Sequence, residues 1–246
     1  MKKKVLAIIP ARGGSKGIPN KNLLKIGDYS LLERALFTAM GSNVLSKIIV
    51  SSDSKEIINK ANSYGDFAPF IRPSSLATDD AKSLPVIQHA LEWSEKAEKK
   101  IYDFVALIEP PCVFRLNTHI DDAVRIAIDK NATSVMSLVE VGDYHPIRMK
   151  KIDKKGLIIS YYIDEPEGLR RQDQDPVYIR NGAVYIFSRD TIFSNKLWGE
   201  RPQPFIMDND LYKINIDEPL DLLVARAFYN EMKKKDNLEM IEYLIK

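Results

Sequence analysis

The chain has 246 residues, which is long enough for one large domain with a substantial buried core, or for one domain with a smaller excursion. Its 36 basic and 34 acidic side chains leave a net charge of +2, which excludes a global positive field that recruits nucleic acid and leaves only local anion binding. No stretch approaches the ~20 apolar residues of a membrane helix, and the single cysteine cannot form an internal disulfide, so we expect a cytoplasmic protein without nucleic-acid or membrane partners.

A glycine-rich loop follows the first predicted strand. Residues Val5–Ile9 are apolar and rich in β-branched side chains without polar alternation, which predicts a short buried strand. Three glycines lie within residues 13–17, so the backbone can bend tightly and its N–H groups can converge on one anion. The nearby side chains that are cationic or donate hydrogen bonds are Arg12, Ser15, Lys16, Asn20, Lys21 and Asn22. This set matches a polyphosphate, and the alternative is a solvated turn with ordinary surface lysines.

The amino-acid sequence of this loop excludes two common phosphate-binding motifs. It has neither the Gly-x-x-x-x-Gly-Lys-Ser/Thr pattern of the P-loop nor the Gly-x-Gly-x-x-Gly fingerprint of dinucleotide-binding folds. Pro19 also blocks a helix directly after Gly17, because proline lacks an N–H group and restricts the residue before it. We therefore expect the loop to wrap around its ligand.

Helices alternate with strands through the next part of the chain. Apolar spacing predicts a helix over Ser30–Met40, with Ser30 as its N-cap and Gly41 as its end. The further predicted elements are strands at Lys47–Val50, Phe67–Ile71, Tyr102–Ile108 and Thr133–Val139, and helices at Ser54–Tyr64, Leu84–Lys96 and Thr118–Lys130. In the last of these helices the apolar face, which includes Ile128, is expected to point inward.

Asp53 follows the predicted strand Lys47–Val50, at the place where open α/β sheets bind their ligands. The same residue is a suitable N-cap for the helix Ser54–Tyr64. Of these two roles we expect the cap.

The pattern changes between residues 140 and 177. A basic run over Arg148–Lys155 and a turn at Gly156 precede strand character in Leu157–Ile163. This segment has too little apolar area to fold alone, so we expect a hairpin-like arm, inserted in a single domain of residues 1–246, that packs on a second protomer. The alternative for the basic run is a solvated hairpin face, and we expect its tip, Lys151–Lys155, to be solvated.

A pair of oxygen-bearing side chains lies near the end of the chain. Residues Leu211–Leu222 join a predicted strand to the terminal helix, and strand alternation puts Asn215 and Asp217 on one face. Oxygen ligands spaced in this way suit Mg²⁺, which keeps several waters and takes one or two protein ligands together with phosphates. We expect the metal mainly on Asp217, whose alternative role is the helix N-cap ahead of Pro219.

The chain resembles the CMP-sialic acid synthetase family, the cytidylyltransferases that activate nonulosonic acids. The loop of residues 10–22 is similar to the first motif of this family, and the similarity continues in residues 72–83, 169–187 and 211–222. The resemblance implies CTP and an acidic nine-carbon sugar as substrates, Mg²⁺ as cofactor, and a homodimer in which the arm completes the site of the neighbouring protomer.

The resemblance also implies roles for single residues. Those implied to contact the nucleotide are Ala11, Arg12, Gly13, Ser15, Lys21, Asn22, Arg72, Ala81 and Ser83. The implied catalytic residues are Arg12, Lys16, Lys21 and Asp217, and the metal ligands are Asp217 and Asn215. Those implied to contact the sugar are Glu109, Arg148, Arg171, Gln172, Tyr178 and Asn181, with Arg148 reaching across the dimer interface. Paired arginines can clamp a planar carboxylate, and the alternative for Arg171 is an interdomain salt bridge. Without the resemblance, Arg72 would be interpreted as a surface charge.

Two places depart from the family pattern. Where the family usually reads glutamine, proline, threonine and serine, this chain reads Glu109-Pro110-Pro111-Cys112, so a carboxylate replaces a neutral amide. Where the family frequently has a first aspartate near the end of the chain, this chain has Asn215, a neutral and weaker metal ligand. We expect Cys112 to be a small buried residue, since nothing near it in the sequence suggests an activated nucleophile.

Strands that alternate with helices along nearly the whole chain predict an α/β fold with a three-layer Rossmann-like sheet, of the nucleotidyltransferase type that the resemblance implies, and a small protruding dimerisation arm at residues 140–177. The expected reaction joins CTP and a nonulosonic acid to give the CMP-sugar and pyrophosphate. Two alternatives stay open. One is a cytidylyltransferase for another acidic sugar, such as an octulosonic acid. The other is a catalytically weak nucleotide-sugar binding or regulatory protein, which Glu109, Cys112 and Asn215 suggest.

Overall fold

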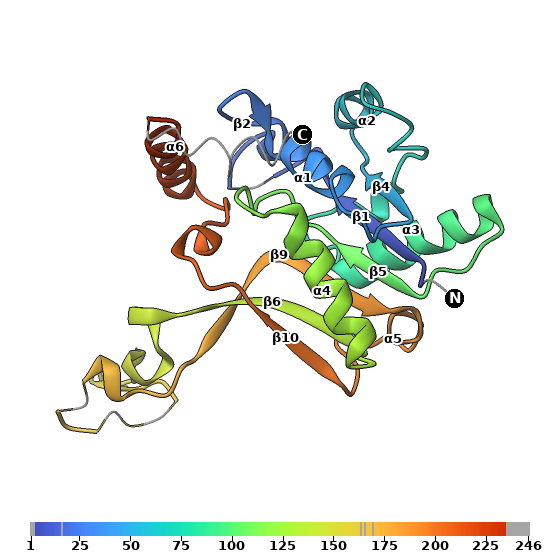
Figure 1. Cartoon of the computed structure of the whole chain (residues 1–246). Coiled ribbons are helices and arrows are strands. Elements are labelled where there is room, and N and C mark those ends of the chain that lie inside the picture. Colours follow the sequence, from blue (N-terminus) through green and yellow to red (C-terminus); the bar gives the residue numbers. More distant parts are fainter. Residues whose placement is uncertain (1–2, 16, 163, 165, 169, 235–246) are drawn as a thin grey trace.

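A mixed β-sheet runs through the centre of the molecule (Figure 1). The computed structural model describes residues 3–15, 17–162, 164, 166–168 and 170–234. Among these, six strands form the sheet in the order β10-β6-β9-β5-β1-β4. Their bounds are β1 (Val5–Pro10), β4 (Lys47–Ser51), β5 (Phe104–Leu107), β6 (Ser134–Glu140), β9 (Tyr178–Ser188) and β10 (Pro202–Ile206). Strand β1 is parallel to β4 and β5, β10 is parallel to β6, and β9 is antiparallel to both of its neighbours.

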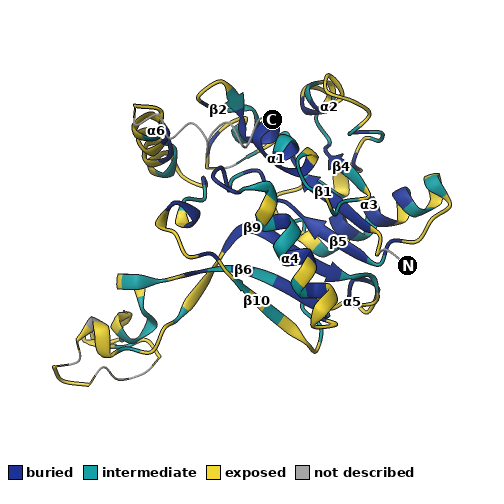
Figure 2. Ribbon diagram, in the orientation of Figure 1, coloured by how far each residue is buried: buried dark blue, intermediate teal, exposed yellow. Residues whose placement is uncertain are grey.

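Helices cover both faces of this sheet. The helices are α1 (Leu31–Met40), α2 (Lys55–Asn62), α3 (Ser83–Glu98), α4 (Asn117–Asp129), α5 (Arg189–Phe193) and α6 (Pro219–Lys234). Alternate residues of β1 serve the two faces: Ala7 and Ile9 pack in one core cluster with α1, α2 and α4, and Leu6 and Ile8 pack in another with α3 and α5. Figure 2 shows β1 and β5, in the middle of the sheet, as buried, while the edge strand β10 is largely exposed. The three-layer α/β prediction is therefore confirmed.

Most predicted elements are present with ends shifted by one or two residues, as is usual for such boundaries. The N-cap prediction for Ser30 is confirmed, because its hydroxyl accepts a hydrogen bond from the N–H group of Glu33 in a complete capping box. The inward prediction for Ile128 is wrong, since this side chain is 42% exposed.

Two predicted strands are wrong. Residues Phe67–Ile71 run beside β4 but form no ladder with it; the N–H group of Val50 donates to Phe67 O, and just beyond the segment that of Arg72 donates to Ser52 O. Pro69 lacks an N–H group, which prevents a regular ladder there. The segment that begins at Leu211 is a 3₁₀-helix, η6 (Asp210–Lys213), followed by irregular backbone.

The register of the parallel strands fixes where a ligand can bind. Pro10 at the end of β1 lies opposite Ser51 at the end of β4, and Ile8 lies opposite Leu107 at the end of β5. The three carboxyl ends therefore share one edge of the sheet. In open α/β sheets ligands bind in the crevice outside this edge.

A hairpin projects away from the sheet beyond the ends of β6 and β9 (Figure 1, lower left). It consists of β7 (Lys150–Ile152) and β8 (Ile158–Ser160), which is shorter than the predicted strand Leu157–Ile163. Four large apolar side chains of the arm, residues 140–177, are 74% to 82% exposed: Tyr144, Ile152, Ile158 and Tyr162. The protruding shape of the arm is as predicted, while its role in dimerisation stays a prediction.

None of the helices in the described part of the chain has the length and apolar character needed to cross a membrane.

His119 makes the stability of the fold sensitive to acid. Its Nδ1 accepts a hydrogen bond from the N–H group of Leu116 at 3.1 Å, and its ring packs edge-on against Tyr212. Burial, together with the positive charge of Arg115, lowers the pKa of His119 to about 4. The unfolded chain, with an ordinary pKa near 6.5, therefore takes up the proton first, so this stabilisation is complete above pH 6.5 and is lost as the pH falls toward 4.

We expect the free energy of unfolding to fall by about 2 kcal/mol between pH 7.5 and pH 5 through this residue. A His119→Gln variant, which cannot titrate, should lose this part of the decrease. Thermal melts of both proteins at the two pH values measure the difference. Parallel pH profiles for the two proteins would show that His119 does not titrate in this way.

Candidate active site

A cavity of about 470 Å³ opens at the carboxyl edge of β1 and β5. Its wall combines the glycine-rich loop, residues 72–86, the end of β5 and residues 215–217. The predicted site residues that line it are Arg12, Ser15, Lys21, Asn22, Arg72, Ala81, Ser83, Glu109, Asn215 and Asp217. Segments from the start, middle and end of the chain therefore meet around one space of nucleotide size.

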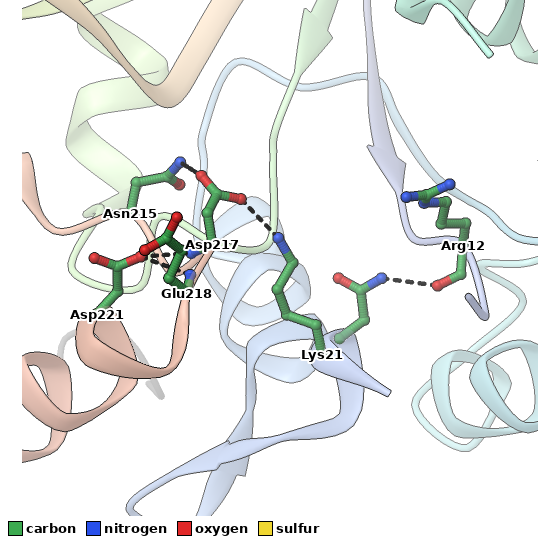
Figure 3. Close-up of polar contacts among 7 residues, drawn as sticks. Arg12, Lys21, Asn215, Asp217, Glu218 and Asp221 are labelled. Carbon is green, nitrogen blue, oxygen red and sulfur yellow. Dashed lines mark hydrogen bonds and ion pairs between the residues drawn. The ribbon is translucent and has the colours of Figure 1, made fainter. Parts of the chain in front are cut away.

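Lys21 and Asp217 meet directly on this wall. Lys21 Nζ lies 2.8 Å from Asp217 Oδ1, and Asn215 Nδ2 donates to Asp217 Oδ2 at 2.7 Å (Figure 3). The alternative role of Asp217 as a helix cap is wrong, because the carboxylate of Asp221 accepts from the N–H groups of Asp217 and Glu218 at the start of α6. Asp217 is thus free to face the cavity.

Backbone contacts hold the glycine-rich loop against the sheet. The N–H group of Gly13 donates to Asp53 Oδ1 at 3.0 Å, and that of Ala11 donates to Ser51 O at 3.0 Å. Asn22 Nδ2 donates to Arg12 O at 3.0 Å and closes the loop from its other end. Ala11 and Gly13 therefore shape the loop without lining the cavity. The cap prediction for Asp53 is wrong, because the N-cap of α2 is Ser54.

Gly17 lies where the loop touches the segment of Asp217. A Cβ atom at residue 17 would stand 2.4 Å from the backbone oxygen of Asp217, and backbone atoms at such a junction cannot move aside cheaply. A glycine is therefore required at this position for the loop and the carboxylate to come together.

We expect Gly17→Ala to lower the free energy of unfolding by about 1–3 kcal/mol, because the loop must move away from Asp217. Gly14→Ala is the matched control, since a Cβ there would meet nothing within 4 Å. Thermal unfolding of the two variants measures the difference. Equal melting temperatures would show that the close contact is not needed.

Two arginines add positive charge to the same wall. Arg12 donates to Asp79 Oδ1 at 2.7 Å. Arg72 is 4% exposed and donates through Nε to Ser51 Oγ at 3.0 Å and through its terminal nitrogen to Ser51 O. Burial lowers the pKa of Arg72 to about 10, so it remains cationic at neutral pH. The interpretation of Arg72 as a surface charge is therefore wrong.

A second cavity of about 390 Å³ adjoins the first. The two share Ser83, Leu107, Glu109 and Asn215. In the second cavity the guanidinium of Arg180 lies 5.7 Å from the centroid of the Trp198 ring. A guanidinium beside an aromatic ring suits a ligand with both a carboxylate and an apolar face. Sequence reasoning missed both residues, because nothing in their local pattern distinguishes them from ordinary strand and loop positions.

Glu109 stands at the junction of the two cavities. Burial is the main cause that raises its pKa, and the negative charge of Asp217 adds to it, while Arg115, Arg180 and Lys21 oppose the shift. Cys112 is buried, and burial raises the pKa of its thiol to about 11. The thiol is therefore protonated at neutral pH, and the prediction of a small buried residue is confirmed.

The predicted sugar contacts have different outcomes. Asn181 is 3% exposed, and its side chain accepts from Ser137 Oγ and the N–H group of Ala183 while it donates to Met207 Sδ and Tyr212 O. All of its hydrogen-bonding capacity is used inside the fold, so the prediction that it contacts sugar is wrong.

Of the other predicted sugar contacts, Glu109 lines both cavities, whereas Arg148, Gln172 and Tyr178 line neither. Arg148, in the arm, lies 3.5 Å from Asp143, and Gln172 and Tyr178 are exposed. Their roles stay predictions, and that of Arg148 depends on a second protomer. Lys16 and the side chain of Arg171 lie outside the described residues.

Arg115 is a residue whose role the sequence did not reveal. It is 1% exposed, and its terminal nitrogen donates to the backbone oxygens of Glu109 at 3.0 Å and Ala183 at 2.8 Å. It thus joins the end of β5 to β9 beneath the junction of the cavities. In the sequence Arg115 is only an arginine shortly after a buried strand, and this position does not indicate whether its side chain is buried or exposed.

Oxygen atoms suited to a hard cation lie beside Lys21. The amide oxygen of Asn215 is buried and has no hydrogen-bond partner, and the carboxylate of Asp217 is 61% exposed. Within the described part of the chain, no group of three or more His, Cys, Asp or Glu residues could hold a metal ion by itself. The residues present therefore fit an ion that takes its remaining ligands from phosphates and water.

Comparisons with known proteins agree with this arrangement. The sequence profile of a family described as "Cytidylyltransferase" matches residues 6–141, more than half of the chain. The CMP-N,N'-diacetyllegionaminic acid synthase of Legionella pneumophila is 29% identical, over 89% of this chain and 93% of that protein. The N-acylneuraminate cytidylyltransferase of Escherichia coli O18:K1:H7 is 32% identical, over 98% of this chain and 55% of that longer protein.

A solved structure shares the fold. The structure of CMP:2-keto-3-deoxy-manno-octonic acid synthetase complexed with CTP superposes with a TM-score of 0.67, over 93% of this chain and 99% of that one. The sequence identity is 14%, so this likeness shows the fold alone.

Proposed function

Because the chain belongs to the cytidylyltransferase family, we propose that it transfers the cytidylyl group of CTP to a nonulosonic acid, giving the CMP-sugar and pyrophosphate. The observation that carries the proposal is the contact of Lys21 with Asp217 on the wall of a cavity that Arg12 and Arg72 also line. A cation and a carboxylate placed together among arginines suit a nucleoside triphosphate and its counterion.

The first cavity would hold CTP. Arg12 and Lys21, which line it, would hold the β- and γ-phosphates that leave as pyrophosphate, and the loop backbone would shape the space around them. Positive charge fixed beforehand stabilises the negative charge that develops on the leaving group without reorganisation during the reaction. Arg72, Ala81 and Ser83 line the same cavity and would face the nucleoside.

The second cavity would hold the sugar acid. Arg180 would bind its carboxylate, and Trp198 and Tyr185 would pack on the carbon skeleton. Because the cavities share Glu109 and Asn215, the anomeric hydroxyl of the sugar would face the α-phosphorus there. The hydroxyl oxygen forms the new bond to phosphorus, the bond from phosphorus to the β-phosphate oxygen breaks, and the hydroxyl proton is released. The protein contributes mainly positioning and charge neutralisation.

Asp217 and Asn215 are the residues that would hold Mg²⁺, since both line the cavity beside Lys21 and the amide oxygen of Asn215 has no hydrogen-bond partner. When bound, Mg²⁺ neutralises phosphate charge and polarises the oxygens that react. Lys21 would keep the carboxylate of Asp217 in place through their contact at 2.8 Å.

A direct test measures pyrophosphate release. The chain is mixed with CTP, Mg²⁺ and a panel of sugar acids that contains sialic, legionaminic, pseudaminic and octulosonic acids. We expect release with at least one nine-carbon acid and its dependence on both CTP and the metal. Tight CTP binding without release from any acid would instead identify a nucleotide-binding protein without this activity.

We also propose that the chain forms a homodimer through the arm. The support is the set of apolar side chains on the arm that are 74% to 82% exposed in the single protomer: Tyr144, Ile152, Ile158 and Tyr162. Light scattering after size exclusion should give a dimer for the parent chain and a monomer for Ile158→Asp. Lys155→Asp, in the exposed turn of the same hairpin, is the matched control and should stay dimeric. A monomeric parent chain would contradict the proposal.

A further inference from the structure

Glu109 and Asn215, which both depart from the family pattern, are neighbours in the structure. They meet at Gly182, whose φ of +71° is a conformation that favours glycine. A Cβ atom at residue 182 would stand 2.8 Å from Glu109 Oε2 and 3.5 Å from Asn215 Oδ1. The two side-chain oxygens therefore approach the same point on β9 from two different segments of the chain.

Neither of these oxygens accepts a hydrogen bond from the described residues. Asn215 Nδ2 donates to Asp217 (Figure 3), and Asn215 Oδ1 is buried without a hydrogen-bond partner. Within the described residues, no donor forms a hydrogen bond with the carboxylate of Glu109, whose backbone oxygen accepts from Arg115 at 3.0 Å and from the N–H group of Cys112 at 3.4 Å. Buried oxygens without donors are costly unless a ligand satisfies them, and hard cations prefer such oxygens.

The side chains around Asp217 carry too little negative charge for a divalent cation unless a second carboxylate contributes. The charge of Asp217 is paired with Lys21 at 2.8 Å, and Asn215 is neutral, so these three side chains sum to no net charge. Glu109 lines the same cavity as Asp217 and Lys21, and its Oε2 approaches Gly182 beside Asn215 Oδ1. Its carboxylate adds the negative charge that a divalent cation needs.

We propose that Glu109 supplies the second carboxylate of the cation site, in place of the acidic side chain that position 215 lacks. This inference rests on the proposed function, since the cation is the one that accompanies CTP. The two departures from the family pattern are then one exchange: the amide and the carboxylate have swapped positions across Gly182, and the number of carboxylates at the site is kept.

The exchange is tested by reversing it. The chain, Glu109→Gln, Asn215→Asp and the double variant are titrated with Mn²⁺ in the presence of CTP and without any sugar acid, and free Mn²⁺ is counted by its electron paramagnetic resonance signal. We expect Glu109→Gln to weaken Mn²⁺ binding about tenfold or more and the double variant to return to within about threefold of the parent. Asn215→Asp alone should not weaken it. Glu56→Gln, an exposed residue of α2, is the control and should change nothing.

The outcomes separate the two proposals. Unchanged Mn²⁺ binding in Glu109→Gln, or no recovery in the double variant, overturns the exchange. A rise of the KM for the sugar acid with unchanged Mn²⁺ binding would overturn it as well and would make Glu109 a sugar contact. If the parent chain releases pyrophosphate but the substitutions are not coupled, the proposed function stands and the exchange fails. Coupled Mn²⁺ binding without pyrophosphate from any sugar acid gives the reverse result.

Discussion

Lys21→Met is expected to lower kcat for pyrophosphate release about 100-fold or more while the fold remains intact. The ammonium group lies 2.8 Å from Asp217 and lines the cavity proposed for the triphosphate. Without it, the departing phosphates lose a fixed positive charge, and removing one such group typically costs two to three orders of magnitude, or about 3–4 kcal/mol. Methionine keeps the apolar stem of the side chain, so the change removes mainly the charge.

The stability of the same variant should change little. Its ion-pair partner Asp217 is 61% exposed, and a pair of this kind contributes about 0–1 kcal/mol to folding. Lys25→Met, an exposed lysine in the short strand β2 (Lys25–Ile26) after the same loop, is the matched control and should keep the parent kcat. Steady-state kinetics and a thermal melt on both variants measure the two effects. A normal kcat in folded Lys21→Met would remove Lys21 from the proposed mechanism.

The local signals in the sequence predicted the part of the site that follows from backbone chemistry. The β-branched run Val5–Ile9 is a buried strand, and the glycines after it form a loop that reaches the cavity. A glycine is needed at residue 17, because only a residue without a side chain can approach the backbone of Asp217 so closely. The meeting of Lys21 with Asp217 was implied by the resemblance to the cytidylyltransferases, because no local pattern connects residues so far apart in sequence.

Predictions failed where the environment of a residue depends on the tertiary structure. Phe67–Ile71 has the composition of a strand, but Pro69 interrupts the donors that a ladder requires. Asn181 was assigned to sugar from the resemblance, whereas its buried amide joins β6, β9 and the η6 segment. Arg180 and Trp198 come together from β9 and the loop before β10, and their spacing along the chain carries no sign of that contact.

Arg115 is the residue outside the cavity wall on which the geometry of the site most depends. Its terminal nitrogen holds the backbone oxygens of Glu109 and Ala183 at 3.0 and 2.8 Å, one residue away from Gly182. These oxygens lie where the ladder between β5 and β9 has ended, since the last pair in that register is Leu107 with Tyr185. At the junction of the two cavities, the guanidinium of Arg115 therefore supplies the hydrogen bonds that backbone N–H groups supply within the ladder.

We expect Arg115→Met to lower the free energy of unfolding by about 3 kcal/mol, because the carbonyl group of Ala183 loses its donor, that of Glu109 keeps only the 3.4 Å bond from the N–H group of Cys112, and methionine cannot replace the lost bonds. For a chain of this length that corresponds to a fall in Tm of roughly 6–12 °C. Arg125→Met, on the exposed side of α4, should change Tm by less than about 2 °C. Activity measured well below the lowered Tm should also fall, because Glu109 and Gly182 lose their fixed separation, and this loss distinguishes a positioning role from a merely stabilising one. A stable variant with the parent kcat would show that the sheet alone holds the junction in place.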